Sequence, residues 1–442
     1  MRPNAQLLKA TLSGALGGLL FGIDMVVISG ALGVIGRLFH LSSLETGITV
    51  AVSPVGTVLG CFAAGVVGQR LGSREALRRA AGLYILAAVG SMLAPAWTVL
   101  LLTRFAGGLA IGAASVLGPV YITELAPAAW RGRLVATFQL MVVTGILFGY
   151  TSNYLVRLAT LGALEWRVML GVALVPAVVF FAALFGIPPS PRWLVARGKS
   201  QQASEILAAM GAASPAAELK AIEKAAHEEH AVTHEPVFRW KYRLPLFLAI
   251  TIGAFNQLSG VNAILFYQGT IFRAAGFDQL SGDLQAIAIG ATNLIFTLVG
   301  MALIDRFGRK SLLVVGAAGT AACLAGVGWI FSTSSHQGLL IALLAGFIGF
   351  FALSQGAVIW VYLGEVFPTS VRAKGQGVGS ASHWIVNTIL ALCFPLVAER
   401  FGQSTPFWFF AAATLVQLVV VSLFYPETRG QTLEELQARL VR

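Results

Sequence analysis

Charged residues and cysteines are scarce in this sequence. Only 11% of its 442 residues are Asp, Glu, Lys or Arg, whereas soluble domains carry about 25%. The three cysteines, Cys61, Cys323 and Cys393, all fall within apolar stretches. We therefore expect no disulfide bond, no metal site and no cofactor. The low charge is typical of a membrane protein.

Long apolar runs are what the sequence has instead, because 57% of its residues are hydrophobic. Runs of about 18 or more residues recur, and each is long enough to cross an apolar layer about 30 Å thick. We predict an all-α membrane protein with twelve transmembrane helices. They lie near residues 11–35, 46–68, 80–96, 97–119, 134–156, 168–187, 244–268, 284–304, 311–331, 338–362, 374–397 and 404–425.

The net charge of +11 follows the expected loops rather than a single patch. With the N-terminus in the cytoplasm, 24 of the 30 Lys and Arg residues fall on cytoplasmic segments and five on outer loops. Arg104 lies inside a span. The positive-inside rule then places both termini in the cytoplasm. The basic residues therefore indicate orientation, and we expect no nucleic-acid partner.

The sequence repeats itself at nearly constant spacing. "YITELAPAAWRG" from Tyr121 matches "YLGEVFPTSVRA" from Tyr362, and "GQRLGSR" from Gly68 matches "IDRFGRK" from Ile304. "PPSPR" from Pro188 matches "YPETR" in the same order. Such pairs indicate an internal duplication of a six-span unit. Two parallel repeats are typical of transporters whose site lies between the repeats near the middle of the membrane.

The domain boundaries follow from this duplication and from one long polar stretch. We expect a first six-helix half over 1–189 and a second, pseudo-symmetric half over 244–425. The stretch 190–243 reads as a cytoplasmic linker of short amphipathic helices, because apolar residues recur three and four apart. Residues 426–442 form a cytoplasmic tail.

The repeated motif places a carboxylate seven residues before an arginine at a cytoplasmic span end. The pairs are Glu124 with Arg131 and Glu365 with Arg372. They suit a latch of ion pairs between helix ends. The alternative is a solvated face, since isolated exposed ion pairs are weak.

Eight motifs in order resemble the sugar porter family of the major facilitator superfamily, above all its bacterial proton-linked hexose and pentose porters. They are "GGLLFGIDMVVISG", "YITELAPAAWRGRL", "WRVML", "PPSPRWL", "NQLSGVNAILFY", "DRFGRK", "YLGEVFPTSVRAKG" and "YPETRGQTLEEL". The resemblance covers nearly the whole chain. It implies the major facilitator fold and a central sugar site.

The resemblance implies that amides and aromatic rings bind the sugar. The residues concerned are Gln139, Asn256, Gln257, Asn262, Asn293, Trp360, His383 and Trp384. Amides both donate to and accept from sugar hydroxyls without adding charge, and indole faces cover the C–H side of the ring. The alternatives are interhelical hydrogen bonds for the amides and packing for the tryptophans. Asn256 and His383 stand where the family usually has glutamine.

The resemblance also implies a cytoplasmic gate of charged residues. Its expected members are Arg70, Arg74, Glu124, Arg131 and Arg192 in the first half, and Asp305, Arg309, Glu365, Arg372, Glu427 and Arg429 in the second. Three positions depart from the family pattern: Gln69, Ser73 and Pro189 stand where charged or strongly polar residues are usual. The first half has therefore lost gate charges.

Asp24 is the only acidic residue deep in an apolar span, and Arg104 lies at a similar depth. Burial favours the neutral acid and a guanidinium favours the carboxylate, so a change in their contact would switch proton affinity. We expect these two residues to couple proton movement. The alternative is a static ion pair. Some family members add a glutamate in span six, where this chain has Ala173.

The function implied is proton-coupled uptake of a monosaccharide of the glucose, galactose or xylose class by alternating access. A passive facilitator of the same fold is the alternative, and a non-transporting sugar receptor with a signalling tail is less favoured. We expect no enzyme, because the polar segments contain no phosphate-binding glycine loop and no nucleophile–base pair. We expect a multi-pass, monomeric protein of the bacterial inner membrane, in contact with lipid.

Overall fold

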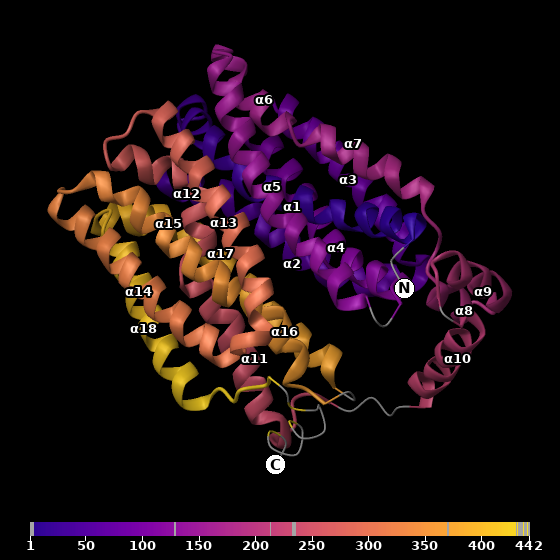
Figure 1. Ribbon diagram of the computed structural model, residues 1–442. Helices are drawn as coiled ribbons and strands as arrows, with labels where there is room; N and C mark the ends of the chain where they lie inside the picture. The colour runs from indigo at the N-terminus through magenta and orange to yellow at the C-terminus, as the bar shows by residue number, and fades with distance from the viewer. Residues whose placement is uncertain are drawn as a thin grey trace. The chain divides into compact units, whose positions relative to one another are not determined.

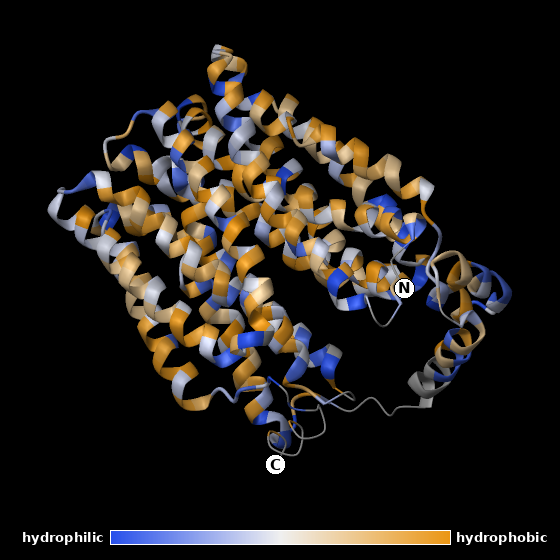
Figure 2. Cartoon of the chain, viewed as in Figure 1, coloured by the Kyte–Doolittle hydropathy of each residue, from blue (hydrophilic) through white to orange (hydrophobic). Residues whose placement is uncertain are grey.

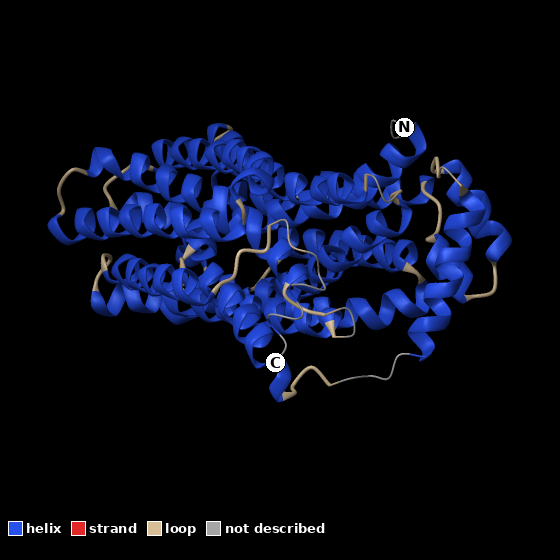
Figure 3. Cartoon of the chain, turned by 60° about the horizontal axis from the view of Figure 1, so that its bottom comes forward, coloured by secondary structure: helices blue, strands red, loops and turns tan. Residues whose placement is uncertain are grey.

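Helices make up most of the described part of the chain. The computed structural model describes residues 4–127, 130–212, 214–231, 236–368, 371–429, 431, 436 and 440. Within these residues there is no β-strand (Figure 3). The interior of a helix pairs its backbone N–H and C=O groups within its own segment, as an apolar bilayer requires.

Twelve helical segments among the described residues are long and apolar enough to cross a membrane, which confirms the number predicted. Figure 1 labels the α-helices that form them and the linker. Their bounds are α1 Ala5–Leu38, α2 Ser43–Leu71, α3 Ser73–Leu93, α4 Trp97–Leu125, α5 Arg131–Leu158, α6 Glu165–Gly171, α7 Leu174–Ala183, α8 Pro191–Ala196, α9 Ser200–Ala209, α10 Pro215–Ala231, α11 Arg243–Leu258, α12 Val261–Ala274, α13 Gln279–Phe307, α14 Arg309–Thr333, α15 Leu340–Phe351, α16 Ala357–Glu365, α17 Arg372–Phe401 and α18 Thr405–Phe424.

Most spans extend beyond the apolar run that predicts them. The run at 46–68 lies inside α2, which continues for a few residues at either end. Hydropathy falls at the helix ends, where polar residues replace the apolar ones (Figure 2). A helix keeps its hydrogen bonds as it leaves the bilayer, so hydropathy marks the membrane layer and not the helix ends.

Three spans are broken, which the apolar runs do not predict. Span six divides into α6 and α7 at Val172–Ala173, and span ten contains a π-helical turn at Ala352–Gly356 between α15 and α16. Span seven divides into α11 and α12 at Gly260, whose φ is +80°. Glycine adopts this left-handed conformation without steric cost, so it permits the break.

The chain divides into two compact units. The first contains Met1–Val27, Val52–Ser152 and Gly162–Thr233. The second contains Ile28–Ala51, Asn153–Leu161 and His234–Arg442. The second unit thus takes in the ends of α1, α2 and α5 together with the later spans. The domain boundaries expected from the duplication stay a prediction.

In the first unit, glycines allow α2 and α4 to pack backbone against backbone. A Cβ added at Gly108 would lie 2.1 Å from the Ser53 carbonyl oxygen, and one at Gly112 would lie 2.2 Å from that of Thr57. Close contact of this kind between small residues is how spans associate where the lipid itself is apolar. The contact holds Ser53 on the face of α2 that packs against α4. Linker helices α8, α9 and α10 pack on one another beside this bundle.

In the second unit, α11 packs along α17 and α14 along α18 (Figure 1). A Cβ at Gly253 of α11 would lie 2.3 Å from the Gly379 carbonyl oxygen of α17. Gln257 follows Gly253 by one helical turn, and His383 follows Gly379 by one turn. Because the two backbones meet at this point, the side chains one turn further on are brought together.

Candidate functional site

Asp24 of α1 lies inside the first unit beside residues from three other spans. Ser53 Oγ donates to Asp24 Oδ2 at 2.9 Å, and the Tyr84 hydroxyl donates to Oδ1 at 3.4 Å. Arg104 Nη2 lies 3.9 Å from Oδ2. The Arg104 side chain is 5% exposed and that of Asp24 18% exposed. The structure therefore brings the two predicted partners together, although a hydroxyl is closer to the carboxylate than the guanidinium is.

A cavity of about 20 Å³ adjoins these side chains. This is close to the space that one water molecule needs. Ala173, at the break between α6 and α7, lines the cavity with a methyl group. Among the described residues that line it, Asp24 is the only carboxylic acid. A proton carried at this place has a single acidic group to bind.

Sequence reasoning missed Ser53 and Tyr84. The signal for Tyr84 is weak but present, because it is the only tyrosine of span three and lies among alanines. Ser53 precedes Pro54 in α2 and carries no signal of its own. Only the packing of α2 and α3 around α1 places both hydroxyls on the carboxylate.

A second polar cluster lies in the second unit and contains no charged residue at hydrogen-bonding distance among the contacts described. Gln257 Nε2 donates to Asn256 Oδ1 at 2.9 Å and lies 3.2 Å from Nε2 of the His383 ring. Asn256, Gln257 and His383 are all buried. An amide nitrogen carries two hydrogens. Asn256 Oδ1 and the His383 ring are the acceptors for these two hydrogens. The Gln257 carbonyl oxygen can therefore accept a hydrogen bond from a further donor.

Aromatic rings surround His383. The Trp384 ring lies 5.1 Å from it edge to face, and the Trp360 ring lies 5.4 Å away at a tilt. Trp384 is buried, whereas Trp360 remains 43% exposed. Two indole rings thus adjoin the polar cluster through the His383 ring.

The remaining predicted sugar residues are placed less closely. Asn262 follows the break in span seven, and Asn293 lies in α13, where it accepts from Thr297 Oγ1 at 3.5 Å. Both asparagines are buried. Gln139 lies half-buried in α5 of the first unit.

Asn387 is a residue that sequence reasoning missed. It lies in α17 one turn after His383 and Trp384, is 1% exposed, and both polar atoms of its amide lack a hydrogen-bond partner. A buried unpaired amide is costly unless something binds it. The spacing of four from His383 would have identified it, because residues four apart share a helix face.

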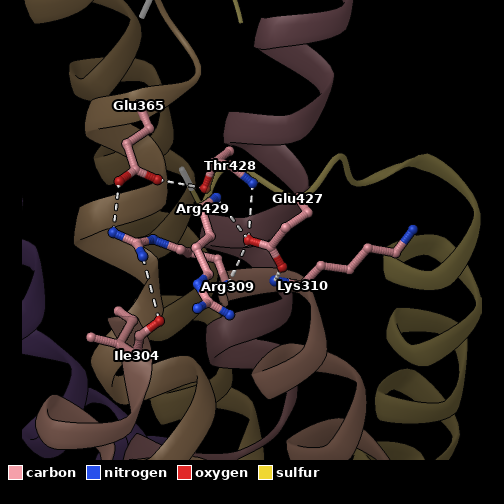
Figure 4. A network of polar contacts seen from close by, with 7 residues as sticks. All are labelled: Ile304, Arg309, Lys310, Glu365, Glu427, Thr428 and Arg429. Carbon is pink, nitrogen blue, oxygen red and sulfur yellow. Dashed lines mark hydrogen bonds and ion pairs between the residues drawn. The ribbon is translucent and has the colours of Figure 1, made fainter. Parts of the chain in front are cut away.

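The expected gate residues of the second unit form a network at the ends of their spans (Figure 4). Glu365 accepts from Arg309 Nη2 at 3.0 Å and from Thr428 Oγ1 at 2.6 Å. Arg429 donates to the carbonyl oxygen of Arg306. Arg372 Nε donates to a backbone carbonyl oxygen at 3.2 Å. The side chain of Asp305 lies outside the described residues.

Glu427 caps a helix in this network. Its two carboxylate oxygens accept from the backbone N–H groups of Arg309 and Lys310, at the start of α14, and from those of Thr428 and Arg429. Partial burial on its own would raise the pKa of Glu427, but these four N–H groups outweigh it, so the pKa lies below its usual value. The carboxylate also faces the positive end of the helix dipole.

The gate residues of the first unit are arranged differently. Glu124 accepts from Ser73 Oγ at 2.9 Å, and Arg74 Nη1 donates to the carbonyl oxygen of Ile187 at 3.1 Å. Arg131 Nη2 lies 3.5 Å from the Ala126 carbonyl oxygen rather than on a carboxylate. The carbonyl oxygen of Arg70 accepts from the linker. Arg192 is exposed in the first turn of α8.

Known proteins match this chain along its whole length. Residues 10–440 match the model of the "Sugar (and other) transporter" family. The arabinose-proton symporter of Bacillus subtilis is 35% identical over 433 residues, covering 96% of this chain and 93% of that protein.

Solved structures agree with this match. The xylose transporter XylE from E. coli in an inward-open conformation superposes with a TM-score of 0.87 at 30% identity, covering 98% of this chain and all of XylE. The major facilitator superfamily proton:xylose symporter XylE bound to 6-bromo-6-deoxy-D-glucose gives 0.81 at 30% identity, covering 99% of both chains. The predicted major facilitator fold is confirmed. The chain belongs to the sugar transporter family and is a multi-pass membrane protein.

Proposed function

We propose that this protein is a secondary active transporter that moves a monosaccharide together with a proton by alternating access. The observation that carries the proposal is the half-buried Asp24 carboxylate beside the buried Arg104 and beside Ser53 and Tyr84. Ionisable groups inside a membrane span are costly and mark function more often than structure. The similarity to an arabinose-proton symporter and a proton:xylose symporter supports the same reaction class.

Asp24 carries the coupled proton in this proposal, and Arg104 sets its affinity. The substrate is a pentose or hexose bound by Gln257, Asn262 and Asn293, with Trp384 against the ring. These residues are uncharged, so the site suits a neutral sugar. Asn387 joins them, because its amide is buried and unpaired on the same helix face as Trp384.

The remaining members of the sugar site are Gln139, Asn256, Trp360 and His383. Asn256 and His383 hold the Gln257 amide in one orientation, which leaves its carbonyl oxygen to accept from a sugar hydroxyl. The expected gate residues close the cytoplasmic side. Both termini face the cytoplasm, the protein lies in a bacterial inner membrane, and it acts as a monomer.

The experiment that tests the proposal compares wild-type protein with Asp24→Asn in proteoliposomes. The amide resembles the protonated acid at every pH and cannot release a proton. Uptake against a sugar gradient, driven by an imposed pH gradient, should vanish in the variant. The pH change that sugar induces in lightly buffered vesicles should vanish with it. Exchange of labelled for unlabelled sugar should persist, because it requires only that the loaded carrier reorients.

Asp278→Asn is the matched control, because Asp278 is exposed at the start of α13 and asparagine caps a helix equally well. It should accumulate sugar as wild type does. If wild-type protein never accumulates sugar above equilibrium, the passive facilitator is the correct function. If Asp24→Asn still accumulates sugar, the proton binds elsewhere. If Asp24→Asn loses both sugar exchange and its folded structure, the result would support a static ion pair between Asp24 and Arg104.

A further inference from the structure

The cavity of about 20 Å³ beside Asp24 also reaches two hydroxyl groups to which the proposed function gives no role. They belong to Ser91 of α3 and Thr103 of α4, and both line the cavity together with Tyr84 and Arg104. All of these residues lie in the first unit. A water molecule needs about 10–15 Å³ of such space and about two to four polar partners. The volume therefore suits one water molecule, and the polar lining decides whether one binds.

Small residues create this space. A Cβ added at Gly90 of α3 would lie 2.5 Å from Thr103 Cγ2, so the two helices approach closely at this level. The same approach brings Ser91 Oγ, on the next residue of α3, to 2.9 Å from Thr103 Oγ1. The rest of the lining includes four small residues: Ala87, Ala88, Gly107 and Ala173. The hydroxyl pair is therefore held at the wall of a cavity that these small side chains leave unfilled.

The hydrogen bonds of the hydroxyl pair run in one direction. Thr103 Oγ1 donates to the backbone carbonyl oxygens of Val99 and Leu100, each at 3.0 Å. A carbonyl cannot donate, so the single hydrogen of Thr103 is used there. Ser91 must therefore be the donor to Thr103. Because its hydrogen is used in this way, Ser91 Oγ can only accept from a further partner.

Arg104 brings the opposite requirement to the same cavity. Among the described residues, its buried Nε has no hydrogen-bond partner. Its Nη2 lies 3.9 Å from Asp24 Oδ2, which is longer than the about 2.7–3.2 Å of a direct hydrogen bond. A guanidinium can only donate, and a buried donor without a partner is costly. A gap of this length leaves room for a bridging water molecule.

Asp24 has acceptor capacity left for such a molecule. Ser53 Oγ donates to Oδ2 at 2.9 Å, whereas the Tyr84 hydroxyl lies 3.4 Å from Oδ1, a long hydrogen bond. A carboxylate oxygen accepts two hydrogen bonds. Asp24 Oδ1 and Ser91 Oγ are thus two acceptors on the cavity, and Arg104 Nε is one donor. A water molecule, which donates two hydrogens and accepts on its oxygen, matches this set.

We propose that the cavity holds one water molecule, which accepts from Arg104 Nε and donates its two hydrogens to Asp24 Oδ1 and Ser91 Oγ. The proposal rests on the proposed function in that Asp24 is the proton carrier. Ser91 and Thr103 are then positioning residues, because Thr103 orients the Ser91 hydroxyl and Ser91 holds the water molecule.

The water molecule lowers the affinity of Asp24 for a proton, because a hydrogen bond donated to a carboxylate favours its charged form. The other groups that act on the carboxylate are Arg104 of α4 and the hydroxyls of Ser53 on α2 and Tyr84 on α3. Arg104 is the only other charged side chain in the described lining. Span six contributes apolar residues there, Leu170 and Ala173.

The test uses infrared difference spectra of the purified full-length protein in proteoliposomes, recorded over a range of pH. The carbonyl band of protonated Asp24 is identified by its absence in Asp24→Asn. A bound water molecule is identified as an O–H band that shifts in water labelled with heavy oxygen. In wild-type protein this band should change together with the Asp24 carbonyl band as the pH is lowered.

Ser91→Val and Ser91→Thr form a matched pair, because they add nearly the same volume and only threonine keeps the hydroxyl. Ser91→Val should lose the water band, and the pH at which half of Asp24 is protonated should rise by about one unit. Ser91→Thr should keep both the band and the midpoint. Thr414→Val removes another span hydroxyl, which donates to the Phe410 carbonyl oxygen at 2.8 Å on α18, and should change neither.

Three results would overturn the proposal: no heavy-oxygen-sensitive band that follows Asp24, an unchanged midpoint in Ser91→Val, or the same rise in both Ser91 variants. Failure of the proposed function is distinct, because then no carbonyl band depends on Asp24 at any pH. Should Ser91→Val fail to fold, Ser91→Ala provides a second test, since it removes the hydroxyl without adding volume. Its water band should move, because one hydrogen has lost its acceptor, and an unchanged band would count against the proposal.

Discussion

The two units of this protein differ in the partner of the motif glutamate and in the make-up of their interior polar clusters. In the first unit an ionisable pair, Asp24 and Arg104, lies inside the membrane spans, while the motif glutamate at the span end is bonded by a hydroxyl group. In the second unit the interior cluster is built from amides, and the ion pair of Arg309 with Glu365 lies at the span end. The ion pair Asp24–Arg104 thus lies within the spans of the first unit, and the pair Arg309–Glu365 lies at a span end of the second.

Equivalent positions of the two sequence repeats carry different side chains on the same backbone conformation. Ser73 and Arg309 occupy equivalent places in the repeated motif, and each bonds the motif glutamate of its own half. The preceding glycines have nearly the same φ, +81° at Gly72 and +84° at Gly308. A Cβ would meet the Trp193 ring at Gly72 and the Glu427 carboxylate at Gly308. The same turn is therefore covered by an indole in one half and by a carboxylate in the other.

The tyrosines of the repeated motif have kept their role in both halves. The Tyr121 hydroxyl donates to the Pro188 carbonyl oxygen at 2.7 Å, and that of Tyr362 donates to Pro426 at 3.4 Å. These bonds tie the motif to the segment that follows the sixth span of each half. The backbone plan is thus conserved between the halves while the charges on it are not.

The change with the largest expected effect is Arg309→Ser, which gives the second half the residue of the first. Glu365 would lose its charged partner and keep the hydrogen bond from Thr428. A hydrogen bond to a charged group contributes about 1.5–3 kcal/mol, so the thermal unfolding midpoint of the purified protein should fall. Arg400→Ser, at an exposed position, is the control and should leave the midpoint nearly unchanged. Equal shifts for both would mean that the ion pair adds nothing.

Gln257→Ala tests the neutral interior of the second half. Loss of the amide leaves a sugar hydroxyl unpaired at about 1–3 kcal/mol, which corresponds to binding weakened by about fivefold to a hundredfold. Titration of the best substrate into the folded variant measures the Kd. Gln417→Ala removes another buried amide of the same unit, on α18, and should leave the Kd as it is. An unchanged Kd for Gln257→Ala would remove this residue from the site.

Glu427→Gln tests the charged cap of α14 through its pH dependence. A carboxylate at a helix N-terminus contributes about 0.3–1 kcal/mol. Because the folded pKa of Glu427 is lowered, this stability is present above the unfolded value of about 4.3 and is lost as pH falls through the folded value. The unfolding midpoints of wild type and variant should therefore differ by a constant amount from neutral pH to about pH 5 and converge below about pH 4. Glu399→Gln, an exposed control, should show no such convergence.

The smallest effect is expected from Pro189→Glu, which restores to the first half a carboxylate that the family usually has there. An exposed ion pair contributes about 0.2–1 kcal/mol, so the ratio of conformations should change by at most about fivefold. If the lost charges weaken closure of the cytoplasmic side, spin-label distances across that side should shift toward the outward-open state. Pro189→Gln removes the proline without adding charge and should not produce the shift. A shift in the inward direction would contradict the idea.

The sequence predicted the architecture well, because a bilayer leaves few choices. Apolar runs had to become spanning helices, and the repeated motifs identified both the duplication and the family. The pairing of Asp24 with Arg104 was predicted from depth alone, since each residue's distance along its helix gives its level in the membrane. Asp24 and Arg104 have few other charged groups to meet at that depth.

The contacts between polar side chains were decided by how the helices pack on one another. The spacing of residues along a single helix does not predict this packing. The approach of Gly253 to α17 decides that His383 holds the Gln257 amide, and the approach of Gly108 to α2 places Ser53 on Asp24. The break at Gly260 also depends on tertiary structure, because an apolar run has the same hydropathy whether its helix is straight or broken. Hydropathy thus determined which segments cross the membrane, and side-chain packing across helix pairs determined which polar atoms meet there.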